Sequence, residues 1–422
     1  MRLPISTCLL VLLFVFTSLA RAAEPDALAT AAQRIADQIA PTPQVDAALY
    51  APAFLKTVPA GQITALCKTL HQQHGQVRRV TLESRTGPLA GKFTFNFKDV
   101  DMPVTLALEP DGAHRVTGLW FGPTVPRLKS LEEVTQRLGK LPGKTSFQLQ
   151  RLGDGKVLAA HEAETPLAIG STFKLYLLAA LVQDGAAWDR VVKLDDRYKS
   201  LPTGEMQTWP AGAPVTLHTL ALKMISQSDN TATDHLLAQI GRGRVEKLLP
   251  ELGLKKPEAN VPFLGTREAF RLKADAELRK RFVAATAADR ATLLDKLLGT
   301  PGPTVAQLDL ARPVAIDEVE WFASAADLCR VMAWFDNKND AASLAILAVN
   351  PGISVPNQFT YAGFKGGSET GVLNLTWLLK ARDGERYVLS ASWNDANSPV
   401  DEPKFVGLMR ATMDLIEAKP SR

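Results

Sequence analysis

Cysteine is scarce in this chain of 422 residues, which contains only Cys8, Cys67 and Cys329. So few thiols exclude a small scaffold held by disulfides and a zinc site made of several thiolates. Neither an H-E-x-x-H nor a C-x-x-C pattern occurs, so the sequence predicts no metal site and no cofactor. We expect Cys67 and Cys329 to be free buried thiols, because they fall in different predicted domains; a disulfide between them in an oxidising compartment is the alternative.

An excess of charge of one sign is also missing. The formal net charge is +4, and the Lys and Arg residues alternate with Asp and Glu instead of forming a basic stripe. A nucleic-acid partner is therefore not predicted. No apolar run approaches the roughly 20 residues that a membrane-spanning helix needs, so stable membrane insertion is not predicted either.

The N-terminus has the pattern of a secretory signal peptide over residues 1–22. Arg2 precedes an apolar stretch at 8–16, and Ala20-Arg21-Ala22 supplies the small residues that signal peptidase prefers. We predict cleavage near Ala22 and a periplasmic or secreted protein. An uncleaved anchor is the alternative, but the apolar stretch is short for one.

The length of the remaining chain predicts two domains. Residues 24–123 combine helical patterns with four strand-like runs, which predicts a small α+β domain similar in pattern to cystatin-like or NTF2-like domains. A role in docking the neighbouring domain is favoured over ligand binding, because no paired acid and base occurs in it. Residues 124–144 are predicted to form a linker helix.

Residues 145–420 are predicted to fold as an α/β sandwich with a five-stranded antiparallel sheet. Two strand patterns at 147–152 and 157–161 are joined by Gly153-Asp154-Gly155, which favours a hairpin. A long helical body follows, and three further strands at 361–367, 372–381 and 387–393 and an amphipathic helix at 403–418 complete the domain.

Three short motifs follow one another in this predicted domain. Ser171 and Lys174 begin an apolar helix, where i, i+3 spacing puts them on one face and a desolvated lysine amine can accept the serine proton. Ser-Asp-Asn follows at 228–230 and Lys-Gly-Gly-Ser at 365–368. Taken singly, these are also ordinary sequences for a helix cap, a capped turn and a strand-end bulge. In this order they indicate a catalytic serine.

On these motifs, residues 145–420 resemble the penicillin-recognising serine hydrolases, which include class A β-lactamases and penicillin-binding proteins. The stretch at 201–210 and the two-domain layout are similar to a clavulanate-cluster subgroup, in which a cystatin-like domain precedes a β-lactamase-like one. The resemblance implies roles for seven residues: Ser171 as acylated nucleophile, Lys174 as its base, Ser228 as proton relay, Lys365 as source of positive potential, the amides of Ser171 and Ser368 as oxyanion hole, and Asn230, Gly367 and Ser368 as substrate-binding residues.

Two departures from the family pattern matter for function. Gly366 stands where the family usually has Thr or Ser, so one carboxylate-binding hydroxyl is missing unless Ser368 replaces it. The family loop Glu-x-x-Leu-Asn, whose glutamate activates the deacylating water, is absent, and Glu268 is the only carboxylate at 261–270. Glu268 is therefore a candidate deacylation base, with a solvated helix surface as the alternative.

The sequence thus predicts a serine hydrolase that forms an acyl-enzyme with a small β-lactam, ester or cell-wall peptide substrate, without a cofactor, and that deacylates slowly. One alternative is an esterase or a D-Ala-D-Ala carboxypeptidase. The other is a β-lactam- or muropeptide-binding protein that is acylated once and does not turn over.

Overall fold

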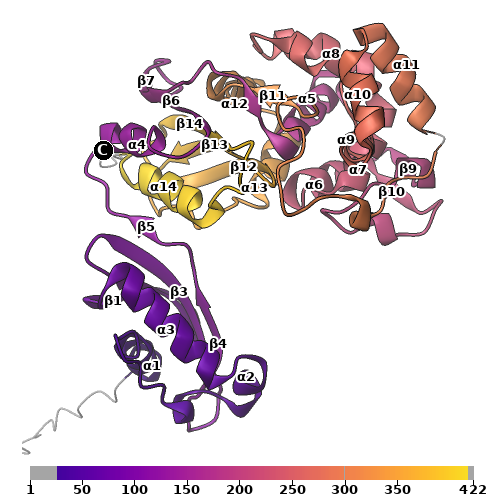
Figure 1. Ribbon diagram of the computed structural model, residues 1–422. Coiled ribbons are helices and arrows are strands. Elements are labelled where there is room, and N and C mark those ends of the chain that lie inside the picture. The colour runs from indigo at the N-terminus through magenta and orange to yellow at the C-terminus, as the bar shows by residue number, and fades with distance from the viewer. Residues whose placement is uncertain (1–25, 299, 417–422) are drawn as a thin grey trace, which may run out of the picture. The chain divides into compact units, whose positions relative to one another are not determined.

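The computed structural model describes residues 26–298 and 300–416, so the predicted signal peptide lies outside the described residues (Figure 1). Contacts within the chain divide it into two compact units, residues 1–122 and 123–422. Across the described ranges, no helix combines the length and apolar character needed to cross a membrane.

The first unit packs helices against an antiparallel sheet in which the strands follow the order β1-β2-β3-β4. Its elements are α1 (Ala27–Asp37), α2 (Pro52–Thr57), α3 (Ala60–His74), β1 (Arg79–Gly87), β2 (Ala90–Asn96), β3 (Val100–Leu108) and β4 (Val116–Phe121). Alternation along β2 turns Phe93 and Phe95 inward, where they meet the apolar face of α1 around Leu28 and Ile35. The unit is therefore α+β, with one core between helices and sheet.

A five-stranded sheet in the order β12-β13-β14-β6-β7 organises the second unit, and every neighbouring pair is antiparallel. Its strands are β6 (Lys144–Arg151), β7 (Val157–His161), β12 (Phe359–Glu369), β13 (Val372–Ala381) and β14 (Arg386–Asn394). The central strands β13 and β14 are buried on both faces, which explains their nearly continuous apolar sequences. The predicted five-stranded antiparallel sheet is confirmed.

Helices cover both faces of this sheet. On one face α4 (Leu131–Leu138) and α14 (Glu402–Asp414) share a core with Trp377 and Phe147, and on the other lies α12 (Ala325–Lys338). Within the segment predicted as a linker, α4 buries Val134 and Leu138 completely in this core. Cys329 in α12 and Cys67 in α3 are free and buried, as predicted.

The helical body of the second unit lies between β7 and β12 in the sequence. It contains α5 (Lys174–Gln183), α6 (Leu217–Ser226), α7 (Asn230–Ile240), α8 (Arg242–Glu251), α9 (Thr266–Ala274), α10 (Ala276–Ala284), α11 (Ala287–Leu298) and α13 (Ala341–Ala348), with short strands β8 (Leu167–Ala168), β9 (Val191–Lys193), β10 (Pro214–Thr216) and β11 (Phe322–Ala323); β5 (Val125–Pro126) precedes α4. Every residue from Lys174 to Leu181 is buried. Because α5 is apolar on all sides, it runs through the centre of the body and carries the Lys174 amine there.

Candidate active site

Ser171 lies in a single 3₁₀ turn that leads into α5. The Phe173 ring stacks on Trp321 with centroids 3.7 Å apart, and the Thr172 hydroxyl donates to Asn374 Oδ1 of β13 at 2.8 Å. The turn is therefore fixed by packing on one side and by a buried hydrogen bond to the sheet on the other, which pre-orders the serine.

The turn and strand β12 touch through two glycines. A Cβ atom on Gly367 would lie 2.4 Å from the Ser171 nitrogen, and one on Gly170, which has a φ of +47°, would lie 3.0 Å from the Ser368 nitrogen. Any side chain at 367 would push the strand away from the turn. The predicted oxyanion-hole amides of Ser171 and Ser368 therefore belong to two backbone segments in direct contact, as joint stabilisation of one oxyanion requires.

Lys174 is completely buried, and its amine donates hydrogen bonds to groups of the second motif. Its Nζ donates to the Ser228 carbonyl at 2.6 Å, to Ser228 Oγ at 3.1 Å and to Asn230 Oδ1 at 2.7 Å. Burial, and then the nearby Lys365 charge, hold the pKa of the Lys174 amine well below its usual range. A neutral amine is therefore accessible at this position, and a neutral amine can accept a proton.

Lys365 approaches the same hydroxyl from the sheet. Its Nζ lies 3.1 Å from Ser228 Oγ, the same separation that Lys174 makes with that atom. Burial lowers the pKa of the Lys365 amine to about 7. Ser228 thus bridges two buried amines from different motifs, and a proton can pass between them through one hydroxyl.

A strained backbone aims Ser228 at these amines. Its φ is +57°, a left-handed conformation that costs of order 1–3 kcal/mol and persists only when its surroundings enforce it. The enforcement comes from Asp229, whose buried carboxylate accepts the amides of Glu205 at 2.7 Å, Met206 at 2.9 Å and Ala232 at 2.8 Å. Gly204 packs so closely on Asp229 that a Cβ there would lie 2.2 Å from its carboxylate oxygen.

Asn230 has partners at both ends of its side-chain amide. Oδ1 accepts from Lys174, and Nδ2 donates to the Leu201 carbonyl at 2.9 Å. In this arrangement Asn230 links α7 to the loop at 201–203. The substrate-binding role of Asn230 stays a prediction, and it requires the amide to exchange one of these two partners for substrate.

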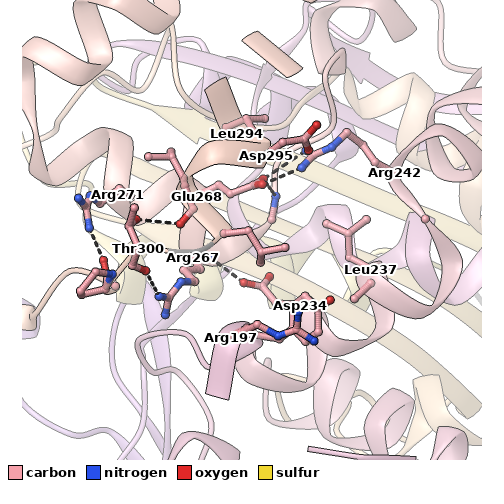
Figure 2. A pocket seen from close by; sticks show the side chains of 18 residues that line it. Arg197, Asp234, Leu237, Arg242, Arg267, Glu268, Arg271, Leu294, Asp295 and Thr300 are labelled. Atoms are coloured by element: carbon pink, nitrogen blue, oxygen red, sulfur yellow. Dashed lines mark hydrogen bonds and ion pairs between the residues drawn. The ribbon is translucent and has the colours of Figure 1, made fainter. Parts of the chain in front are cut away.

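Glu268 lies at the start of α9 and uses both carboxylate oxygens within the protein. Oε1 accepts from Arg242 at 2.7 Å, and Oε2 accepts the amide of the N-cap residue Gly265 at 2.7 Å. Figure 2 shows this pair in the wall of a cavity of about 230 Å³ that also contains Asp234 and Arg267. None of the four predicted catalytic residues lines that cavity. The role of Glu268 as deacylation base stays a prediction, without support from these contacts.

Sequence reasoning missed a polar junction between α7 and α9. Asp234 accepts the amides of Thr266 at 2.7 Å and Arg267 at 2.9 Å, and the Thr266 hydroxyl lies 3.2 Å from the Asn230 carbonyl. Burial raises the pKa of Asp234 to about 6. The only local signal is Asp234 on the buried face of α7, and its partner helix begins 32 positions later, so spacing could not reveal the contact.

Asn374 was also missed, although it left a signal. It interrupts the apolar run of β13 and is completely buried. A polar side chain there needs hydrogen-bond partners, and Asn374 accepts from the hydroxyls of Thr172 and Thr376 and donates to Ser392 Oγ. A buried amide in a central strand therefore indicated a buried polar network, and only the structure shows that this network includes the nucleophile turn.

Comparisons with solved structures find similar chains of low identity. The β-lactamase from Sphaerobacter thermophilus is 20% identical over 69% of this chain and 98% of its own, with a TM-score of 0.49. The β-lactamase from Desulfarculus baarsii is 18% identical over 69% of this chain and 100% of its own, with a TM-score of 0.48. A PBP-A variant in an acyl-enzyme complex with penicillin G is 14% identical over 69% and 98%, with a TM-score of 0.48.

No curated protein matches the chain. Residues 129–305 match the model of the β-lactamase enzyme family, a range that begins just before α4 and includes the Ser171 turn and the Ser-Asp-Asn turn at 228–230. The match covers β6, β7 and much of the helical body, and it ends before β12, β13 and β14. The second unit therefore has a β-lactamase-like α+β fold.

Proposed function

We propose that the second unit is a serine hydrolase that forms an acyl-enzyme on Ser171. The observation that carries the proposal is the meeting of Lys174 and Lys365 at the Ser228 hydroxyl, 3.1 Å from each amine, beside the turn that holds Ser171. Burying two amines is costly, and nothing in the packing of the fold requires it. A site that moves protons to and from a serine does require it.

Acylation proceeds as follows in this proposal. Neutral Lys174 takes the proton of Ser171, whose Oγ attacks the substrate carbonyl, and the amides of Ser171 and Ser368 bind the resulting oxyanion. Ser228 gives its proton to the leaving nitrogen or oxygen and is reprotonated by Lys174, so the amine returns to its neutral state. Lys365 supplies positive potential for this relay and for a substrate carboxylate.

The proposed substrates are small β-lactams, esters or cell-wall peptides. The β-lactamase-like fold supports this class, and export with cleavage near Ala22 would place the enzyme in the periplasm or outside the cell. The first unit is proposed to be a cystatin-like or NTF2-like domain with a docking role. The narrower alternatives are an esterase or D-Ala-D-Ala carboxypeptidase, and a binding protein that is acylated once.

Labelling with a fluorescent penicillin tests the proposal. Wild-type protein and a Ser84→Ala control, which changes an exposed serine of the first unit, should carry the label. Ser171→Ala and Lys174→Ala should each abolish it, because nucleophile and base act as one unit. Labelling that survives in Ser171→Ala would contradict the proposal. A stoichiometric burst without later turnover would favour the binding protein over the enzyme.

A further inference from the structure

A buried cluster of three charged side chains lies outside the acylation machinery. Lys273 of α9 pairs with Glu320 at 2.6 Å and with Glu369 at the end of β12. Lys273 and Glu320 are 7% and 3% exposed, whereas 27% of the Glu369 side chain reaches solvent. Buried ion clusters contribute little net stability, since desolvation offsets their attraction. A cluster that leaves one carboxylate accessible therefore points to a chemical role.

Strand alternation places Glu369 on the face of β12 that meets the nucleophile. Lys365, Gly367 and Glu369 share one face, because side chains two apart in a strand point the same way. A Cβ on Gly367 would lie 2.4 Å from the Ser171 nitrogen, and two residues of strand span roughly 7 Å. Glu369 thus directly follows the oxyanion-hole residue Ser368 and lies on the same strand face as Gly367, the residue that approaches the serine turn.

The other end of the cluster supports the same turn. Glu320 immediately precedes Trp321, whose carbonyl accepts the Ile169 amide at 2.9 Å and whose ring stacks on Phe173. Strands β8 and β11 pair antiparallel through Ala168 and Phe322, which holds this segment beside the serine turn. The cluster is therefore connected to the turn through two chain segments, the one at 320–323 and the end of β12. Lys273 of α9 pairs with the glutamate of each segment.

We propose that Glu369 is the general base of deacylation and that Lys273 and Glu320 position its carboxylate. The inference rests on the proposed acyl-enzyme. Glu369 takes a proton from a water molecule, whose oxygen bonds to the acyl carbon. When the bond from that carbon to Ser171 Oγ breaks, Oγ takes the proton that Glu369 holds. The products are the free acid and the starting enzyme, so no other reactant is needed.

The surroundings of Glu369 set the pH at which it can act. Burial first and then Glu320 raise the pKa of Glu369 above its ordinary value, against the lowering effect of Lys273. Lys365 shares its strand face, and Glu320 and Lys273 are the charged groups that approach from the other elements. The raised pKa favours the protonated carboxyl, so deacylation should become faster as the pH rises and a larger fraction of Glu369 is ionised.

The test separates the two halves of the reaction with p-nitrophenyl acetate as substrate. Glu369→Gln should keep the wild-type burst but slow the phase after it by about 10² to 10⁴, the usual effect of losing a general base. The acetyl adduct should then accumulate in the intact mass. Glu277→Gln, at an exposed position of α10, is the matched control and should behave as wild type. Glu268→Gln tests the rival carboxylate and should also leave the phase after the burst unchanged.

Two further variants keep the inference testable if Glu369→Gln does not fold. Glu369→Asp retains the charge for Lys273 but withdraws the carboxylate, and should slow deacylation at least about tenfold. Lys273→Gln removes the cation that favours the ionised carboxylate, and should move the midpoint of the deacylation pH profile upward by about one unit or more without changing the burst.

The outcomes distinguish this inference from the proposed function. Absence of any burst in the wild type would contradict the acyl-enzyme itself. A normal burst with unchanged deacylation in Glu369→Gln or Glu369→Asp would overturn the role of Glu369 alone. Collapse of deacylation in Glu268→Gln, or a wild-type adduct that persists at pH 9, would overturn it equally.

Discussion

Replacing Lys365 by methionine should stabilise the folded protein at neutral pH while removing its proposed activity. Lys365 is 3% exposed, and burial lowers the pKa of its amine from 10.5 to about 7. Methionine fills a similar volume and carries no amine to desolvate. A residue that serves catalysis and destabilises the fold should show both effects when it is replaced: stability rises and activity is lost.

The difference in free energy of unfolding between wild type and Lys365→Met depends on pH, and the size of this dependence follows from the two pKa values of Lys365. Between pH 7 and 9.5 the unfolded chain holds a proton on residue 365 that the folded protein lacks, so rising pH stabilises the wild type relative to Lys365→Met. With folded and unfolded pKa values of about 7 and 10.5, the difference changes by about 3 kcal/mol over this interval. In the variant, Lys174 loses the repulsion of the Lys365 charge, so its pKa is lowered less and the stability of the variant depends less on pH. This effect adds to the one at residue 365.

Urea unfolding followed by tryptophan fluorescence measures this difference at both pH values. The variant should have the larger free energy of unfolding at pH 7 and should lose most of that advantage by pH 9.5. Lys280→Met removes an exposed lysine and should show almost no pH-dependent difference. A stability difference for Lys365→Met that stays constant to within about 0.5 kcal/mol would refute the reasoning, since an amine whose pKa is lowered by folding must couple folding to pH.

Three other predictions address the second motif, export and metal independence. Asp229→Ala leaves three backbone amides without their acceptor and should lower the free energy of unfolding by about 2–5 kcal/mol; a loss below about 1 kcal/mol would show that the turn does not need it. N-terminal sequencing of the exported protein should begin close after Ala22, and full-length protein retained in the cytosol would refute the signal peptide. Hydrolysis should survive EDTA, whereas turnover lost to chelation and restored by zinc would defeat a metal-free mechanism.

Much of the fold could be predicted because its signals are local. The segment from Val372 to Ala381 is a strand pattern in the sequence and is β13 in the structure, with the predicted bounds. The bounds of other elements moved by a few residues where caps and registers decide them. The Pro403–Ala418 pattern, for example, becomes the helix Glu402–Asp414, because Asp401 caps it through the Lys404 amide.

Each motif of the site could be predicted from the sequence, but the contacts between the motifs could not. Ser171 and Lys174 are neighbours on one turn, so spacing alone relates them. Lys365 and Ser228 are 137 positions apart in the sequence, so their contact depends on the whole fold between them and on the register of β12. The Lys273 cluster was out of reach for the same reason, since its glutamates are 47 and 96 positions away.

The structure explains two glycines whose role the sequence does not reveal. Gly204 and Gly367 are small because Asp229 and the Ser171 turn occupy the space where their side chains would be. From the sequence alone, Gly367 belongs to a motif but Gly204 is one glycine in a loop. Close approach, rather than a turn signal, explains why both positions exclude a larger residue.

Peptide mapping of the penicillin G adduct tests the central claim most directly. Trypsin should release residues 157–174, a peptide that contains Ser171 as its only serine. The account predicts that this peptide carries the mass of one penicillin G and that fragmentation places it on Ser171. An adduct on any other peptide, or hydrolysis of penicillin G at typical enzyme rates of 1–10³ per second without any adduct even after rapid acid quenching, would contradict it.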